Sequence, residues 1–121
     1  MTISEALREA DRLKPNSFPA EQKRRWLERL ELRCRGEILR HYGAPLPQWE
    51  PFGAGEMDRT LLASDPYDEM YVHWLCAQMD FFEREYESFN ASNAMFEAVW
   101  RRWRNAVNQT EKARTARKSY G

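Results

Sequence analysis

The feature that most constrains the fold of this chain is the spacing of its apolar residues, which recur every three or four positions in four segments. This interval places apolar side chains on one face of an α-helix, and no segment shows the alternation typical of a strand. Ten of the sixteen aromatic residues lie between residues 67 and 103. We therefore expect an all-α fold: a compact bundle of about four helices with a long central loop and a flexible basic C-terminal tail.

The ends of the first two helices carry recognisable signals. Thr2 and Glu5 have the spacing of a capping box, and the helix that they begin should stop before Lys14. Pro19 marks the first turn of a second helix of about twenty residues, for which Gly43 is a suitable C-terminal cap. The predicted buried faces consist of Ile3, Ala6, Leu7, Ala10 and Leu13 in the first helix and Trp26, Leu27, Leu30, Cys34 and Ile38 in the second.

Residues 44–64 form a long loop that lacks helical periodicity and contains three prolines and two glycines. Loops of this length in small domains are usually functional or mobile. This one carries Trp49 and Phe52, which are unusual in a segment that only connects two helices. We expect both aromatic residues to contact a partner, and the loop to gain order when it docks.

Two more helices are predicted after the loop, and they should pair as an antiparallel hairpin with the second helix packed across them. Asp65 and Pro66 fit an N-cap and a first helical position, and Ser92 would cap the last helix after a break at residues 90–93. The predicted buried stripes are Tyr67, Met70, Tyr71, Trp74, Leu75, Met79, Phe82, Tyr86 and Phe89, followed by Phe96, Val99, Trp100, Trp103 and Val107. The face opposite the first stripe is expected in solvent and carries Glu69, His73, Asp80, Glu83 and Glu87.

The length of 121 residues fits a single soluble domain that can bury a core without disulfides or metals. We assign residues 1–108 to a helical domain that includes the loop, and residues 109–121 to a basic tail. No stretch has the ~18 apolar residues of a membrane span, so we expect an intracellular protein without a membrane partner. Cys34 and Cys76 are expected to be free thiols that are buried or half-buried.

The formal net charge is zero, but the charges are unevenly distributed. Residues 1–43 sum to +3, residues 44–97 to −9 and residues 98–121 to +6. A uniformly basic nucleic-acid-binding protein would not hold so acidic a middle segment, whereas copies of one protein can set opposite patches against each other. The alternative is that the segments neutralise each other within one molecule.

Few residues have the arrangement that catalysis or metal binding requires. His41 and His73 are the only imidazoles, and a surface or capping role suits each of them. Glu69 and His73 lie one helical turn apart, but one such pair does not complete a metal site. Glycine-rich phosphate-binding motifs are absent from the sequence. We expect no enzymatic activity, no catalytic or metal-binding residues and no cofactor.

The arginines are the most informative polar residues. A ridge of them follows the second helix with a gap at Gly36, and others charge the C-terminal end. Guanidinium groups bind phosphates and the carboxylates of partner proteins, although an arginine ridge is also common on a solvated helix face. The residues that we assign to a protein interface are Arg25, Arg29, Arg33, Arg40, Trp49, Phe52, Arg101, Arg102, Arg114, Arg117 and Lys118.

A series of short motifs occurs in a fixed order along residues 3–108. They are Leu13-Lys14-Pro15-Asn16, Glu21-Gln22-Lys23 with Arg25-Trp26-Leu27 and Leu30, Pro66-Tyr67-Asp68-Glu69 with Tyr71, and Tyr86 and Asn90 before Ala94-Met95-Phe96. In this order the chain resembles the small head-tail connector proteins of long-tailed bacteriophages, a family of adaptor or head completion proteins. It departs from that pattern in residues 44–55 and in the basic tail beyond Gln109.

The resemblance implies a structural virion protein of the neck, many copies of which form a ring beneath the portal. Its partners would be further copies of itself, the portal protein and a tail-side stopper or tail component. Packaged DNA would pass nearby without sequence-specific binding, along the acidic face of the third helix. The protein would reside at the head-tail interface of the virion, and in the host cytoplasm during assembly.

Two other functions are compatible with the same residues. The chain could be a small helical nucleic-acid-binding protein of phage packaging or regulation, with Arg25, Arg29 and the tail on phosphates. It could also be a cytosolic adaptor with no role in a virion.

Overall fold

The computed structural model describes residues 1–42 and 46–120, with side chains described for residues 1–40 and 46–110. Its elements are α1 (Ile3–Leu13), α2 (Ala20–Tyr42), the short 3₁₀ helix η1 (Ala54–Glu56), α3 (Glu69–Phe82) and α4 (Tyr86–Tyr120). Within these residues the β-type pairing is a single bridge between Thr2 and Thr60. The predicted all-α bundle of four helices with a long central loop is confirmed.

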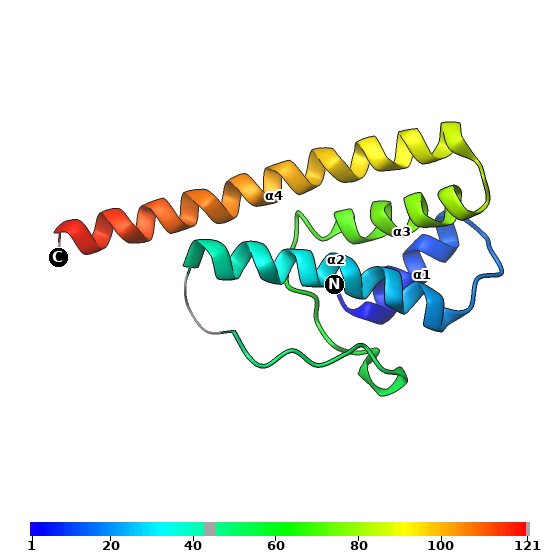
Figure 1. The fold of residues 1–121 in the computed structure, drawn as a ribbon, viewed down its shortest axis with the longest axis horizontal. Helices are drawn as coiled ribbons and strands as arrows, with labels where there is room; N and C mark the ends of the chain where they lie inside the picture. Colours follow the sequence, from blue (N-terminus) through cyan, green and yellow to red (C-terminus); the bar gives the residue numbers. More distant parts are fainter. Residues whose placement is uncertain (43–45, 121) are drawn as a thin grey trace.

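The four helices pack around one core (Figure 1). α3 and α4 form the expected antiparallel hairpin, α2 lies alongside it, and α1 packs against α2 and α3. The loop after α2 returns along the side of α2 that faces away from α4. Trp26, Tyr71 and Phe96 are among the largest fully buried side chains, and they come from three different helices.

The boundaries of the first two helices match their sequence signals closely, but the prediction that Leu13 is buried is wrong: as the last residue of α1 it is 48% exposed. The Thr2 side chain accepts a hydrogen bond from the backbone N–H of Glu5 (3.1 Å), and the Glu5 carboxylate accepts one from the backbone N–H of Thr2. α1 ends at Leu13, directly before Lys14, and α2 begins directly after Pro19. The predicted cap Gly43 lies outside the described residues.

The third helix begins later than predicted. Asp68 is its N-cap and Glu69 its first residue, so the assignment of Asp65 as N-cap and Pro66 as first helical residue is wrong. The reason is a separate turn, in which the backbone N–H of Tyr67 donates to the carbonyl of Ser64 (2.8 Å). The peptide bond between Asp65 and Pro66, inside this turn, is cis.

The hairpin between α3 and α4 also lies elsewhere than predicted. The chain reverses at residues 83–85, where Arg84 has a φ of 60° and the N–H of Glu85 donates to the backbone carbonyl of Asp80 (2.9 Å). The predicted break at residues 90–93 is wrong. Ser92 lies inside α4 and does not cap it, because its hydroxyl faces α3 and donates to the Asp80 carboxylate (3.0 Å).

Asp80 is fully buried, which corrects the prediction that it lies on a solvated face. Its carboxylate forms an ion pair with the Lys14 ammonium group and accepts the hydroxyl of Ser92, so α3 is joined to the end of α1 and to α4. Burial by itself would lower the pKa of Lys14, but the hydrogen bonds and negative charges of Asp80 and Glu85 together outweigh it and raise this pKa. The Lys14 side chain also donates to the hydroxyl of Ser88 (2.9 Å).

The early turn changes the surroundings of the aromatic stripe. Phe82 and Tyr86 were assigned to the buried face, but 52% and 58% of their surfaces are exposed, because α3 ends at Phe82 and the chain reverses before α4 begins at Tyr86. Phe82 still stacks on the ring of Trp26 with one side, at a centroid distance of 5.4 Å. Its other side faces solvent, as does much of Phe81.

α4 continues past the point where the apolar pattern predicts its end. Trp103 and Val107 are buried, and the helix then runs on to Tyr120 through the basic segment. Residues 109–120 contain no glycine or proline and are rich in alanine, arginine and lysine, which favour helix. Figure 1 shows this end projecting beyond α2. The flexibility of the segment stays a prediction.

Replacing Lys14 by methionine should reveal the contribution of the buried carboxylate to stability. We expect the free energy of unfolding to fall by about 3–5 kcal/mol, because Asp80 would remain buried without its counter-charge. Urea denaturation measures this change. The control is Arg12→Met, which removes the exposed ion pair with Glu9 and should cost about 0–1 kcal/mol. Equal effects of the two substitutions would contradict the assignment.

Candidate protein-binding site

Two of the predicted interface arginines, Arg33 and Arg40, line an open cavity between α2 and α4. We call this cavity the arginine pocket; its lining consists of Arg33, Gly36, Glu37, Arg40, Trp100 and Arg104. Its volume of about 350 Å³ is sufficient for one or two side chains of a partner.

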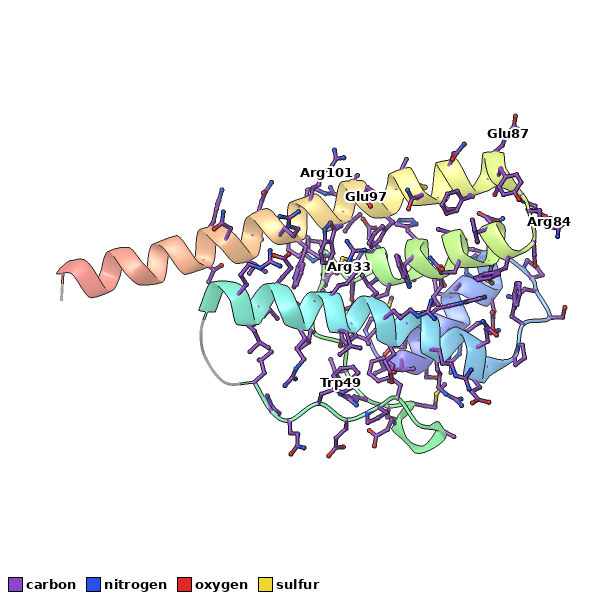
Figure 2. All side chains as sticks on the ribbon, in the orientation of Figure 1. Arg33, Trp49, Arg84, Glu87, Glu97 and Arg101 are labelled. Carbon is purple, nitrogen blue, oxygen red and sulfur yellow. The ribbon has the colours of Figure 1, made fainter. Side chains whose placement is uncertain are left out.

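Arg33 is held in the pocket by aromatic rings. Its guanidinium carbon lies 4.5 Å from the ring centroid of Trp100, and slightly under 6 Å from those of Trp74 and Phe96. In Figure 2 this side chain lies between α2 and α4. Stacking on an aromatic face leaves the guanidinium edge free to donate hydrogen bonds, so Arg33 is oriented before any ligand arrives.

Glu37 joins the other two arginines of the pocket. Only 9% of its side chain is exposed, and its carboxylate lies 3.5 Å from Arg40 and 3.7 Å from Arg104. The described lining residues therefore carry three guanidinium groups and one carboxylate, which pairs with two of them. This excess of positive charge in a partly enclosed site favours a further anionic group, either a carboxylate or a phosphate.

Gly36 opens the pocket toward solvent. It lies within α2, where glycine is unfavourable, yet a Cβ atom built at this position would meet no atom within 4 Å. Packing inside the chain therefore does not require a glycine here. The missing side chain gives a partner close access to the backbone of α2.

The other predicted interface arginines are more dispersed. Arg25 pairs with Glu21 one turn before it (2.6 Å), and Arg102 with Glu69 on α3 (3.5 Å). Arg29 and Arg101 are exposed, and Figure 2 shows Arg101 on the outer side of α4. The side chains of the remaining predicted residues lie outside the described part: Arg114, Arg117 and Lys118.

The aromatic residues of the loop face inward. Phe52 is 7% exposed and belongs to the core, and Trp49 packs partly against that core. Arg59 covers both rings, with its guanidinium carbon 5.1 Å from the centroid of Trp49 and 5.0 Å from that of Phe52. Much of their surface is thus already used within the chain, and their role in contacting a partner stays a prediction.

The loop is fastened to α2 by hydrogen bonds. The Glu28 carboxylate accepts from the backbone N–H of Phe52 (2.7 Å), the Glu31 carboxylate accepts from that of Leu62 (2.8 Å), and Arg35 donates to the carbonyl of Pro47. These contacts form within a single chain. The described part of the loop, residues 46–64, therefore does not need docking to become ordered, contrary to the expectation from the sequence.

Glu31 also connects the loop to α3. Its carboxylate accepts a hydrogen bond from the Tyr71 hydroxyl (2.7 Å), and that hydroxyl accepts one from the backbone N–H of Ala63 (2.9 Å). Burial raises the pKa of Glu31 above its ordinary value of 4.5, although the hydrogen bonds from Tyr71 and Leu62 lower it in part. The Glu31 carboxylate therefore holds the loop and α3 to α2, and it is a group that can titrate.

A second surface, which the sequence pattern did not predict, lies at the end of the hairpin. We call residues 81–87 the acidic turn; it contains Phe81, Phe82, Glu83, Arg84, Glu85, Tyr86 and Glu87. All seven residues are classed as exposed, and Figure 2 shows Arg84 and Glu87 pointing away from the body. Exposed aromatic residues that lie together are typical of protein-binding surfaces.

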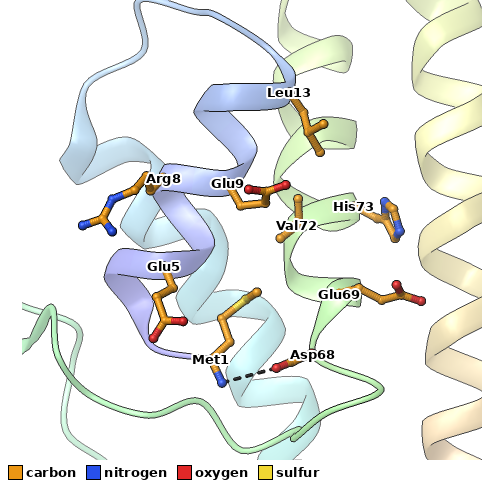
Figure 3. A pocket seen from close by; sticks show the side chains of 9 residues that line it. All are labelled: Met1, Glu5, Arg8, Glu9, Leu13, Asp68, Glu69, Val72 and His73. Carbon is orange, nitrogen blue, oxygen red and sulfur yellow. Dashed lines mark hydrogen bonds and ion pairs between the residues drawn. The ribbon is translucent and has the colours of Figure 1, made fainter.

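A further cavity, with a volume of about 520 Å³, lies between α1 and α3 (Figure 3). It is lined by Met1, Glu5, Arg8, Glu9, Leu13, Asp68, Glu69, Val72 and His73. An ion pair between the Met1 amino group and Asp68 (3.3 Å) connects its walls, while the ring of His73 points away from α1. None of the lining residues carries a hydroxyl or thiol. Across the described residues no three His, Cys, Asp or Glu side chains are placed to hold a metal ion.

Both cysteines are free and buried, as predicted. Burial raises the pKa of the Cys34 thiol to about 12 and that of the Cys76 thiol to about 11. Both thiols are therefore protonated near neutral pH and poorly nucleophilic.

Comparison with known proteins gives no relatives: no protein-family model, curated protein or solved structure matches this chain. None of the helices in residues 1–42 and 46–120 is both long enough and apolar enough to cross a membrane. The interpretation of function therefore depends on the residues and surfaces of the chain itself.

Substitution of Gly36 tests whether the glycine lowers the free energy of unfolding. We expect Gly36→Ala to raise the free energy of unfolding by about 0.5–1 kcal/mol, because alanine favours helix and its Cβ meets no atom. The matched control is Gly53→Ala, which is also open but lies outside a helix, and should give a smaller gain. A loss of stability in Gly36→Ala, measured by urea denaturation, would show that the fold requires glycine there.

Glu31 predicts a pH dependence of stability. Because its folded-state pKa lies above 4.5, the stability linked to its protonated form is present below pH 4.5 and is lost as the pH rises through the raised pKa. Glutamine keeps an acceptor for Leu62 but does not titrate. The free energy of unfolding of Glu31→Gln minus that of the wild type should therefore increase across this window. A difference that stays constant or falls between pH 4 and 7 would contradict the assignment.

Proposed function

We propose that this chain is a structural virion protein, a head-tail connector or adaptor that forms an oligomeric ring beneath the portal and docks tail-side neck components. The proposal is supported by the order of the sequence motifs and by the arrangement of two complementary surfaces. Its partners are further copies of the same chain, the portal protein and a tail-side component, and its location is the head-tail interface.

The motif residues that carry the resemblance lie at joints between helices. Lys14 pairs with the buried Asp80, and Asn16 receives a hydrogen bond from Lys23 at 3.3 Å. The backbone carbonyl of Trp26 accepts a hydrogen bond from the indole of Trp74 (2.7 Å). The resemblance thus concerns residues that fix the helical body, which is the part that copies in a ring would share.

The observation that carries the proposal is the separation of the arginine pocket from the acidic turn. The turn lies at one end of the hairpin, and the pocket lies farther along α4, where α2 runs beside it. Two complementary patches at different places on one chain produce heterologous, head-to-tail association. Such association closes into a ring when the rotation between copies permits it.

The acidic face once expected along the third helix is smaller than the sequence predicts. Asp80 is buried and Glu69 pairs with Arg102, which leaves Glu83 and Glu87 on the acidic turn. DNA passing through such a ring would meet a chain of zero formal net charge.

A nucleic-acid-binding role is the second candidate. It is favoured by Arg29 and Arg101, which are exposed and form no ion pair with another described side chain. Their guanidinium groups are available to phosphates, and the basic end of α4 would add to them. This role predicts binding to duplex DNA that weakens steeply as the salt concentration rises.

The two roles are separated by imaging the neck of intact particles and by a filter-binding titration with duplex DNA. We expect a ring of this chain at the vertex through which the genome exits, and little binding to DNA at moderate salt. Particles that lack the polypeptide at this vertex would contradict the connector role. Micromolar or tighter DNA binding that falls by about 10³-fold with salt would support the second role.

A further inference from the structure

We infer that the arginine pocket of one copy receives the acidic turn of a second copy of this chain. The inference deepens the proposed function, on which it rests for the existence of a ring. It assigns both halves of the contact between neighbouring copies: guanidinium groups from α2 and α4 on one side, and carboxylates from the end of the α3–α4 hairpin on the other.

The pocket has the charge and the rigidity that a carboxylate requires. Arg33 is stacked on Trp100, and Arg40 and Arg104 are held by the nearly buried Glu37. These groups lose little side-chain freedom on binding because they are already oriented. The indole of Trp100 also shields the site on one side, which strengthens a charge pair formed there relative to one in open water.

Gly36 gives the second, independent indication of an occupant. The chain accepts a poor helix former within α2 although, apart from the adjoining helix backbone, no described atom would lie within 4 Å of a Cβ placed there. A turn of a partner could come close to the backbone at Gly36, whereas a larger side chain would stand in its way.

The acidic turn fits this site by charge and by availability. Glu83 and Glu87 are exposed and form no ion pair with any described side chain, whereas Glu85 already lies 3.6 Å from Lys14. The turn is held in shape by the hydrogen bond from the N–H of Glu85 to the carbonyl of Asp80. Its half-exposed Phe82 and Tyr86 would lose contact with water when it docks, which favours association.

A second copy explains these features better than a nucleic acid does. The chain has a formal net charge of zero and its residues 44–97 sum to −9, so it offers a polyanion little long-range attraction. The acidic turn instead contributes carboxylates, whose negative charge balances the excess positive charge of the pocket. Because the turn and the pocket lie at different places along the hairpin, each copy can present its acidic turn to one neighbour and its arginine pocket to the other.

Disulfide trapping tests this contact on the purified full-length chain. One variant carries Gly36→Cys, and the other Arg84→Cys at the tip of the turn, so that the glutamates are kept. The native cysteines are buried and should not interfere. Mixed under mild oxidation, the two variants should form a covalent heterodimer. The matched control replaces Gly36→Cys by Gly53→Cys, another glycine with open surroundings, and should form little.

Charge reversal then tests whether opposite charges hold the pocket and the turn together. Adding Arg40→Glu and Arg104→Glu to the Gly36→Cys chain should lower the yield of heterodimer by about tenfold, and adding Glu83→Arg and Glu87→Arg to the Arg84→Cys chain should recover part of it. Circular dichroism verifies that each variant remains helical.

Several results would overturn the inference. One is a heterodimer yield no higher than that of the Gly53→Cys control at the highest soluble concentration. Another is a heterodimer yield that charge reversal does not change. A third is that charge reversal in the pocket abolishes DNA binding and leaves the heterodimer yield unchanged. The last result would assign the pocket to phosphates. Because the test needs no virion, absence of the chain from particles would overturn the connector role and leave this contact standing.

Discussion

The fold depends on one buried charge, the carboxylate of Asp80. An ionised carboxylate removed from water without a partner destabilises a protein by several kcal/mol, so its partners must lie where the fold places them. Lys14 reaches it from the end of α1, and Ser92 from the second turn of α4. This single group therefore fixes the position of α1 and the register between the two helices of the hairpin.

The register has consequences for both surfaces of interest. With Asp80 facing Ser92, the chain must reverse at residues 83–85, which exposes Phe82 and Tyr86 and gathers glutamates at one end. α4 then runs back along α2 and brings Arg104 beside Glu37. The acidic turn and the arginine pocket are thus two results of one hairpin geometry, and a chain with this geometry has opposite charges to offer to its neighbours.

Local signals in the sequence predicted local structure well. The capping box at Thr2, the end of α1 before Lys14 and the buried stripe of α4 all follow from spacing within one helix. The errors arise where tertiary contacts decide. Asp80 falls among polar residues in the pattern, and only its partner from α1 explains its burial. Likewise, Arg33 and Arg40 were identified from their spacing, but Glu37 and Arg104 join them only across two helices.

The central claim is that the arginine pocket and the acidic turn of separate copies bind each other. The most direct measurement is the chemical shift of backbone amides in the unmodified chain as it is diluted from high to low concentration. The account predicts that the amides of Gly36 and Arg84 and the indole N–H of Trp100 shift together, with one dissociation constant that weakens as salt is added. Shifts that are absent at every concentration, or confined to residues away from both surfaces, would contradict it.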